Sequence, residues 1–158
     1  MPPDDIEYAG FWVRVGASLI DTLLLVFITI PVLLAIYGKS YFGGSSSGFV
    51  AGPADFLLSW IAPAAAAIVF WKYKQATPGK MVFSARVVDA KTGHTLTLAQ
   101  SVVRYLGYFV CAIPFGLGLL WVAFDPKKQG WHDKMAGTVV IRSRRHGHVP
   151  VKFDGAKP

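Results

Sequence analysis

The sequence predicts an α-helical integral membrane protein with two full transmembrane helices, a third apolar segment forming a Pro/Gly-broken helical hairpin, and a small cytoplasmic β-element. Two observations support this fold class. Of the 158 residues, 53% are hydrophobic and only 16% are charged, with a mean hydropathy of +0.44, whereas soluble domains carry about 25% charged residues. The charges also avoid three long apolar windows. This composition excludes a disordered, collagenous or nucleic-acid-wrapping chain, and we expect no nucleic-acid partner.

The three uncharged windows cover residues 22–38, 56–71 and 105–124. A helix needs roughly 20 mostly apolar residues to cross the hydrocarbon core of a bilayer. Together with their flanking residues, the windows place spans at about 11–37, 54–71 and 98–125. Three such segments in so short a chain favour lipid-crossing helices over the buried helices of a soluble core.

The distribution of Lys and Arg predicts which segments face the cytoplasm. Residues 1–10 form an acidic segment, and no small-residue cleavage site follows the first apolar run, so we expect a permanent span rather than a signal peptide. Residues 72–104 and residues 125–158 each carry a net charge of +5. Because basic loops stay in the cytoplasm, both segments are expected on that side of an inner membrane. The interpretation is a multi-pass protein with a cytoplasmic N-terminus and C-terminus.

The third apolar window contains helix breakers near its middle. Pro114, Gly116 and Gly118 interrupt it, and proline and glycine both disfavour a continuous helix. A helical hairpin that enters and leaves on the cytoplasmic side would keep both basic segments together. The alternative is a third simple span kinked at Pro114, with the C-terminus outside.

The cytoplasmic β-element is expected in residues 80–97 and 137–142. Residues 81–89 are rich in β-branched and apolar side chains, and a turn at residues 90–93 leads to a short strand at Thr95 and Leu96, which predicts a hairpin. Thr97 and Gln100 form a capping-box signature that starts a helix at residue 98. The segment at residues 137–142 is expected to pair with the hairpin, which closes a membrane domain over residues 11–142. Residues 143–158 are expected to be a basic, disordered tail.

Two charges stand in or beside the first span. Arg14 and Asp21 are seven residues apart, nearly two helical turns, and therefore share one helix face. An acid inside a span is costly and normally faces protein or water. Asp21 is either a cation or proton site, or a structural clasp to Arg14, to Arg104 or to the backbone of another helix.

The C-terminal part of the sequence carries further polar candidates. His132 beside Asp133 suggests acid–base chemistry, but sequence neighbours rarely point at one another and no Ser or Cys nucleophile is indicated, so we expect no enzyme and no cofactor. A metal site of His132, His146 and His148 is disfavoured, because the last two lie in the tail. The basic residues of the C-terminal segment are expected to contact anionic lipid headgroups, and these are Arg142, Arg144 and Arg145.

Three separated motifs resemble the RDD family of small integral membrane proteins, which is named for one arginine and two aspartates. They are FWVRVGASLID at residues 11–21, TPGKMVFSARVVD at residues 77–89 and FDPKKQGWHDKMAGT at residues 124–138. The resemblance runs from about Phe11 to Arg142. It implies a bacterial membrane location and a proposed transport of unidentified ligands. It also implies that the family's signature residues are Arg14, Asp21 and Asp133, with Asp125, His132 and Arg104 as further contributors.

From these features we expect a polar cluster of Arg14, Asp21 and Asp133 at the cytoplasmic side of the bundle, serving transport of an ion or small solute. Three or four helices enclose little volume, so a homo-oligomer or another membrane protein is expected as a partner. The alternative is a membrane-embedded adaptor that recruits cytoplasmic partners or anionic lipid, in which Asp21 is structural.

Overall fold

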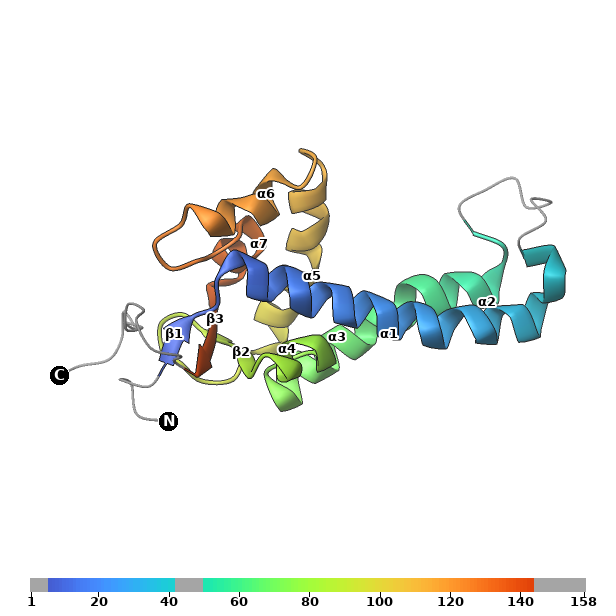
Figure 1. Ribbon diagram of the computed structural model, residues 1–158, viewed down its shortest axis with the longest axis horizontal. Coiled ribbons are helices and arrows are strands. Elements are labelled where there is room, and N and C mark those ends of the chain that lie inside the picture. The colour runs from blue at the N-terminus through green and yellow to red at the C-terminus, as the bar shows by residue number, and fades with distance from the viewer. Residues whose placement is uncertain (1–5, 42–49, 144–158) are drawn as a thin grey trace.

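A computed structural model describes residues 6–41 and 50–143. It contains seven α-helices within these residues, with a three-stranded sheet at one end of the longest helix (Figure 1). The helices are α1 (Phe11–Tyr37), α2 (Pro53–Phe56), α3 (Ala62–Lys74), α4 (Pro78–Val82), α5 (Leu98–Ala112), α6 (Leu117–Leu120) and α7 (Trp131–Ala136). The strands are β1 (Ile6–Tyr8), β2 (Ala85–Asp89) and β3 (Thr138–Ser143).

Within residues 6–41 and 50–143, two helices are long and apolar enough to cross a membrane. One is α1, whose 27 residues are about 40 Å long at 1.5 Å per residue, longer than the hydrocarbon core. The other covers Pro53–Val82 and joins α2, a π-helical turn (η3, Leu57–Ile61), α3 and α4. Both expose most of their apolar side chains, and α1 buries only Ala17 and Leu33. Exposed apolar surface of this extent suits lipid and not water, which supports the predicted α-helical membrane protein.

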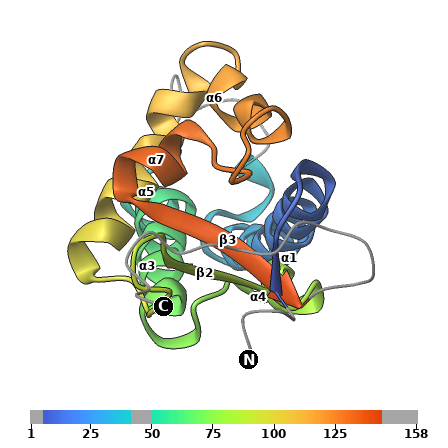
Figure 2. The same cartoon turned by 90° about the vertical axis from the view of Figure 1, so that its left-hand side faces the viewer.

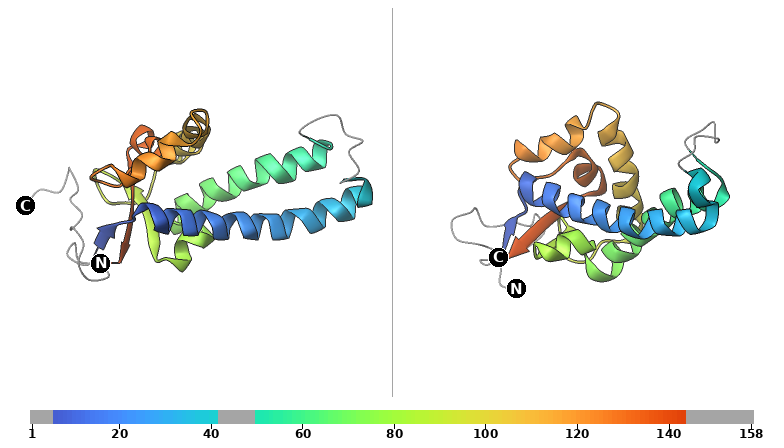
Figure 3. Two further views of the ribbon diagram at one scale, coloured as in Figure 1. Left: turned by 45° about the horizontal axis from the view of Figure 1, so that its top comes forward. Right: turned by 45° about the vertical axis from the view of Figure 1, so that its right-hand side comes forward.

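The third apolar segment is bent by 114° between α5 and the short helical stretch Leu117–Ala123. The break falls at residues 113–116, where Gly116 adopts a φ of +78° that favours glycine. Helix α5 begins at the predicted capping box, in which Thr97 accepts from the backbone N–H of Gln100. The expected break is therefore present, and α5 and α6 lie beside only one half of α1 (Figure 3).

The sheet has the strand order β1-β3-β2, with both pairs antiparallel. The register places Val87 opposite Val140 and Tyr8 opposite Ile141. The sheet lies across the end of the helices (Figure 2). Its apolar face joins helix side chains in one core, whose buried members are Ala9, Trp71, Ala85, Val87, Leu96 and Val140.

The predicted β-element over residues 80–97 needs correction. Residues 80–82 belong to α4, and no strand forms at Thr95 and Leu96. The partner of β2 is β3, so the expected pairing with the segment at residues 137–142 is present, while the predicted local hairpin is not. Leu96 is fully buried in the core instead, and burial explains its apolar character without a strand. The strand β1 was not predicted, because three residues are too few to show an alternation of apolar and polar side chains.

Several predicted features lie outside the described residues. These are residues 1–5 of the acidic N-terminal segment, Arg144, Arg145, His146, His148 and the rest of the basic tail.

Candidate functional site

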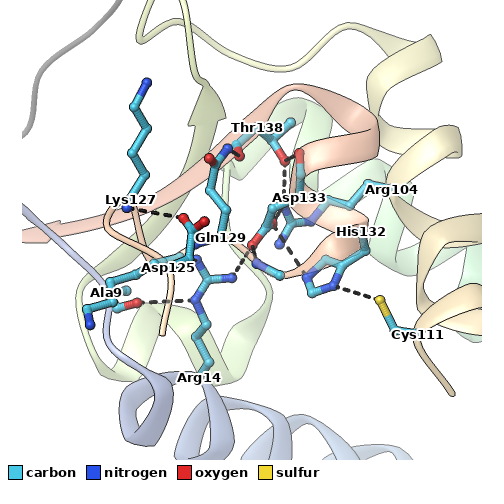
Figure 4. A network of polar contacts seen from close by, with 12 residues as sticks. Ala9, Arg14, Arg104, Cys111, Asp125, Lys127, Gln129, His132, Asp133 and Thr138 are labelled. Carbon is cyan, nitrogen blue, oxygen red and sulfur yellow. Dashed lines mark hydrogen bonds and ion pairs between the residues drawn. The ribbon is translucent and has the colours of Figure 1, made fainter. Parts of the chain in front are cut away.

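The candidate site is a buried ion network centred on Asp133. Its carboxylate is fully buried at the start of α7, and its two oxygens form ion pairs with Arg14 of α1 and Arg104 of α5 (Figure 4). The backbone N–H of Gly130 also donates to Asp133, at 3.1 Å. Two guanidinium groups and one backbone donor therefore saturate this carboxylate, and they connect α1, α5 and α7.

The arginines bind more than Asp133. Arg14 donates from Nε to the Ala9 carbonyl at 3.2 Å and from Nη2 to the Lys128 carbonyl at 2.5 Å. Arg104 donates from Nη1 to Oγ1 of Thr138, the first residue of β3, at 2.6 Å. The network thus connects the residue after β1 and the first residue of β3 to the helices.

Charge and burial oppose each other at Asp133. Burial raises the pKa of a carboxyl group, but Arg104 and Arg14 outweigh this effect and hold the pKa of Asp133 well below its usual range. The neighbouring His132 responds in the opposite way, because burial lowers its pKa to about 3. The imidazole is therefore neutral at physiological pH. It stacks on Tyr108 with ring centroids 4.2 Å apart, and its Nδ1 lies 3.5 Å from Cys111 Sγ.

Asp21 lies apart from this network. Its carboxylate accepts from Thr77 Oγ1 at 2.5 Å and from the Gly79 backbone N–H at 2.7 Å, so it binds the N-terminal end of α4. The predicted cluster of Arg14, Asp21 and Asp133 is therefore wrong in one member. Of the partners weighed for Asp21, the backbone of another helix is the one present, because α4 packs directly against α1.

The further predicted residues have structural contacts of their own. Asp125 pairs with Lys134 and accepts from the backbone N–H groups of Lys127 and Gln129, at 3.1 Å each. Burial alone would raise its pKa, and these donors lower it below the usual value. Arg142 pairs with the buried Glu7 across the sheet, an ion pair that was not predicted. Within the described residues no three His, Cys, Asp or Glu side chains gather as a metal site.

A cavity of about 240 Å³ lies against the ion network. Arg14, Lys80 and Arg104 line it together with Tyr108, Leu119 and Val122. Lys80 is only 6% exposed, and it was expected at the start of the β-element and not at the site. The signal that was available is Pro78, because proline is common at the first position of a helix, and Pro78 begins α4.

The sequence profile of the RDD family matches residues 8–137 of the chain. The chain belongs to the RDD family. The match covers α1, the bent α5–α6 pair and the ion network, and it confirms the resemblance drawn from the three motifs. No solved structure shows a significant similarity to this RDD chain.

The chain is similar to several curated bacterial proteins. It is 33% identical over 141 residues to the uncharacterized membrane protein YteJ of Bacillus subtilis, covering 87% of this chain and 82% of YteJ. It is 45% identical over 76 residues to the uncharacterized protein RP437 of Rickettsia prowazekii, covering 48% of this chain and 42% of that protein. It is 29% identical over 140 residues to a proline-rich antigen homolog of Mycobacterium tuberculosis, covering 86% of this chain and 58% of that protein. The matched segment spans about half the length of the last two relatives. Its family and its similarity to a membrane protein show that this RDD chain is a membrane protein.

Proposed function

We propose that this RDD protein is a multi-pass protein of the bacterial cytoplasmic membrane that takes part in transporting a small solute, with the cavity beside Asp133 as the solute-binding site. The observation that carries this proposal is the cavity, where Arg14, Lys80 and Arg104 line a space at the junction of a spanning helix and the bent α5–α6 pair. Buried ionisable residues in membrane segments commonly mark substrate pathways.

Strand pairing supports a topology in which both termini are cytoplasmic. Strand β2 precedes α5 and strand β3 follows α7, yet they pair in one sheet. The α5–α6 segment between them therefore enters and leaves on one side, as a re-entrant hairpin. Strand β1 precedes α1 and pairs with β3 as well. Two crossings, by α1 and by the helix ending in α4, satisfy this pairing, and the two +5 segments then share the cytoplasmic side.

The size of the cavity limits what the proposed site holds. Its 240 Å³ equals the liquid volume of roughly eight waters and is below the roughly 300 Å³ at which sites for drug-sized ligands begin. Two spans and a hairpin do not enclose a path across the bilayer, so the proposed transporter works as a homo-oligomer or with another membrane protein. The proposal includes no catalytic step, because His132 is neutral and packed against Tyr108.

The test is flux through liposomes that contain the purified full chain. Separate gradients of protons, sodium, potassium, chloride and inorganic phosphate are imposed on the wild type and on Lys80→Gln. We expect at least one gradient to dissipate at least fivefold faster with the wild type than with Lys80→Gln. If none dissipates faster than in protein-free liposomes, the transport role is lost.

A second candidate is an adaptor, favoured by the donors that both signature carboxylates already have. Asp133 connects α1, α5 and α7, and Asp21 connects α1 to the start of α4. Such a platform would recruit cytoplasmic partners or anionic lipid. It predicts that Asp21→Asn alters the melting temperature and leaves any flux unchanged.

A further inference from the structure

The cavity beside Asp133 carries more positive than negative charge. Three cationic side chains line it, Arg14, Lys80 and Arg104. His132 also lines it but is neutral, since burial lowers its pKa to about 3. The nearby carboxylates are Asp133, paired with both arginines, and Asp21, bound to the end of α4. Even with both counted against the three cations, one positive charge is left uncompensated.

The side chains that line the cavity and lack hydrogen-bond partners are also cationic. Arg104 is fully buried, and its Nε and Nη2 have no hydrogen-bond partner within the described part of the chain. Lys80 is nine-tenths buried, and residues 6–41 and 50–143 provide it no ion pair or hydrogen bond. Buried donors without acceptors are costly, and burying an unpaired ammonium is costlier still. An anion that accepts from Lys80 and Arg104 would remove both costs.

The acids, in contrast, already have donors on every oxygen. Both oxygens of Asp133 are paired with arginines, and both oxygens of Asp21 accept hydrogen bonds from α4 and the residue before it. A cation in this cavity would have to share an oxygen that already accepts from a donor, and it would add to the excess of positive charge. The cavity is therefore better suited to an anion than to a cation.

Most of the remaining lining is apolar, and its polar groups are the hydroxyls of Ser18, Thr22 and Tyr108. Phe11, Val15 and Leu19 of α1 face Leu119 and Val122 across the cavity. Leu19 is 59% exposed and Leu119 is 38% exposed, so both continue into the apolar outer surface. A ligand that places a small anionic group on the cations and an apolar chain along α1 would match both parts of the cavity.

We propose that the cavity binds the singly charged phosphodiester headgroup of an anionic phospholipid, with Lys80 and Arg104 as its donors and the acyl chains leaving between α1 and α6. One negative charge equals the uncompensated positive charge, and arginine and lysine are common phosphate ligands. The inference goes beyond the proposed function, because it assigns a lipid ligand to the same cavity and does not require that the protein transport a solute.

The test measures ligand binding through the melting temperature of the full chain in a neutral detergent, because a ligand of the folded state raises it in a concentration-dependent way. Three probes are used: short-chain phosphatidylglycerol, short-chain phosphatidylcholine and inorganic phosphate. We expect phosphatidylglycerol to raise the melting temperature at concentrations where the other two have no effect. Equal shifts with phosphatidylcholine, or a shift with inorganic phosphate and none with phosphatidylglycerol, would overturn the proposal.

Variants assign the binding to this cavity. Lys80→Gln removes one charged donor and is expected to raise the dissociation constant for phosphatidylglycerol about tenfold or more. The matched control is Lys72→Gln, since Lys72 is exposed on α3 outside the cavity, and it is expected to change the constant less than twofold. Leu119→Trp keeps every charge but fills the cavity, so we expect it to abolish binding of phosphatidylglycerol as well. This variant replaces Lys80→Gln in the test if Lys80→Gln does not fold. Unchanged binding in Leu119→Trp overturns the proposal.

The outcomes separate this inference from the transport role. Flux that persists without selective phosphatidylglycerol binding overturns the lipid inference alone. Selective binding without any flux overturns the transport role alone and supports the headgroup site.

Discussion

Asp133 shows how one buried carboxylate holds three elements together. It accepts from guanidinium groups on α1 and α5 while its own backbone lies in α7. Removing one partner of a buried ion pair costs about 3–5 kcal/mol, because the remaining charge stays buried without compensation. Here the loss of Asp133 would strand two arginines, one of which already has two unpaired donors. We therefore expect the loss of Asp133 to destabilise the fold, although the net contribution of each ion pair is small once its desolvation cost is subtracted.

His132 gives the protein a predicted dependence on pH. Burial lowers the pKa of His132 to about 3 from 6.5, so the unfolded chain binds a proton at a higher pH than the folded chain. Its contribution to stability is complete above pH 6.5 and falls as the pH decreases towards 3. Between pH 7 and pH 4.5 we expect the free energy of unfolding to fall by about 2–3 kcal/mol. Reversible unfolding in detergent at the two pH values measures this change.

The control compares how much stability two variants lose on acidification. His132→Gln removes the titrating group and is expected to lose less than half as much as the wild type. His94→Gln alters an exposed histidine near the sheet, and its loss should equal that of the wild type. The carboxyl group of Asp133 does not interfere, because its lowered pKa preserves its charge throughout this range. If His132→Gln loses as much stability as the wild type, another group is responsible.

At the scale of single residues, sequence reasoning identified charges better than their partners. Arg14, Arg104 and Asp133 were all named, because charges beside lipid are few and costly. For Asp21 the backbone of another helix was among the expected partners, but Thr77 and Gly79 could not be named, since they are over 50 residues away and reach it only through tertiary packing. Lys80 was missed because it was expected in the β-element and not in a helix.

Helix α4 packs so closely on α1 that only glycine fits at position 79. A Cβ atom there would lie 2.0 Å from the Ala17 carbonyl oxygen and 2.9 Å from Asp21 Cγ. Gly79→Ala therefore forces the two helices apart and weakens the bond from Gly79 N–H to Asp21. We expect a loss of about 1–3 kcal/mol, typical of overpacking, seen as a lower melting temperature in detergent.

The glycine at the N-cap of α1 serves as the control. Gly10 precedes α1 with a φ of −67°, and a Cβ atom there meets nothing within 4 Å. Gly10→Ala is expected to change stability by less than about 1 kcal/mol. Equal melting temperatures for Gly79→Ala and the wild type would mean that α4 does not pack on α1 in this way.

Elements with a long hydrophobic period were predicted well, whereas the sheet was predicted only in part. The segment at residues 137–142 pairs with β2 as expected, but the strand expected at Thr95 and Leu96 does not form. The capping box at Thr97 and the break near Pro114 are local signals, so they could be read directly. The partner of β2 is not a local signal, because Leu96 and β3 are both apolar and β-compatible. Only the position of the helices decides that β3 pairs with β2 while Leu96 packs in the core.

The sheet limits the membrane topologies that the protein can adopt, because its three strands must lie on the same side of the membrane. Segments from before α1, before α5 and after α7 meet in it. The sheet could not form if α5 and α6 crossed the bilayer as one span, because β2 and β3 would then lie on opposite sides. The proposed re-entrant hairpin is thus tested by locating the two loops that flank it.

Single cysteines at three exposed or half-exposed positions locate these loops: Lys39→Cys, Thr92→Cys and Lys127→Cys. The native Cys111 is buried and gives little background. With a membrane-impermeant maleimide on intact cells, we expect labelling at position 39, beyond α1, and none at positions 92 and 127 until the membrane is permeabilised. Labelling of position 127 from outside, with position 92 protected, would show a third span and separate β2 from β3. The same result would place the cationic cavity between spans rather than beside a hairpin, so the topology decides which leaflet supplies the proposed lipid.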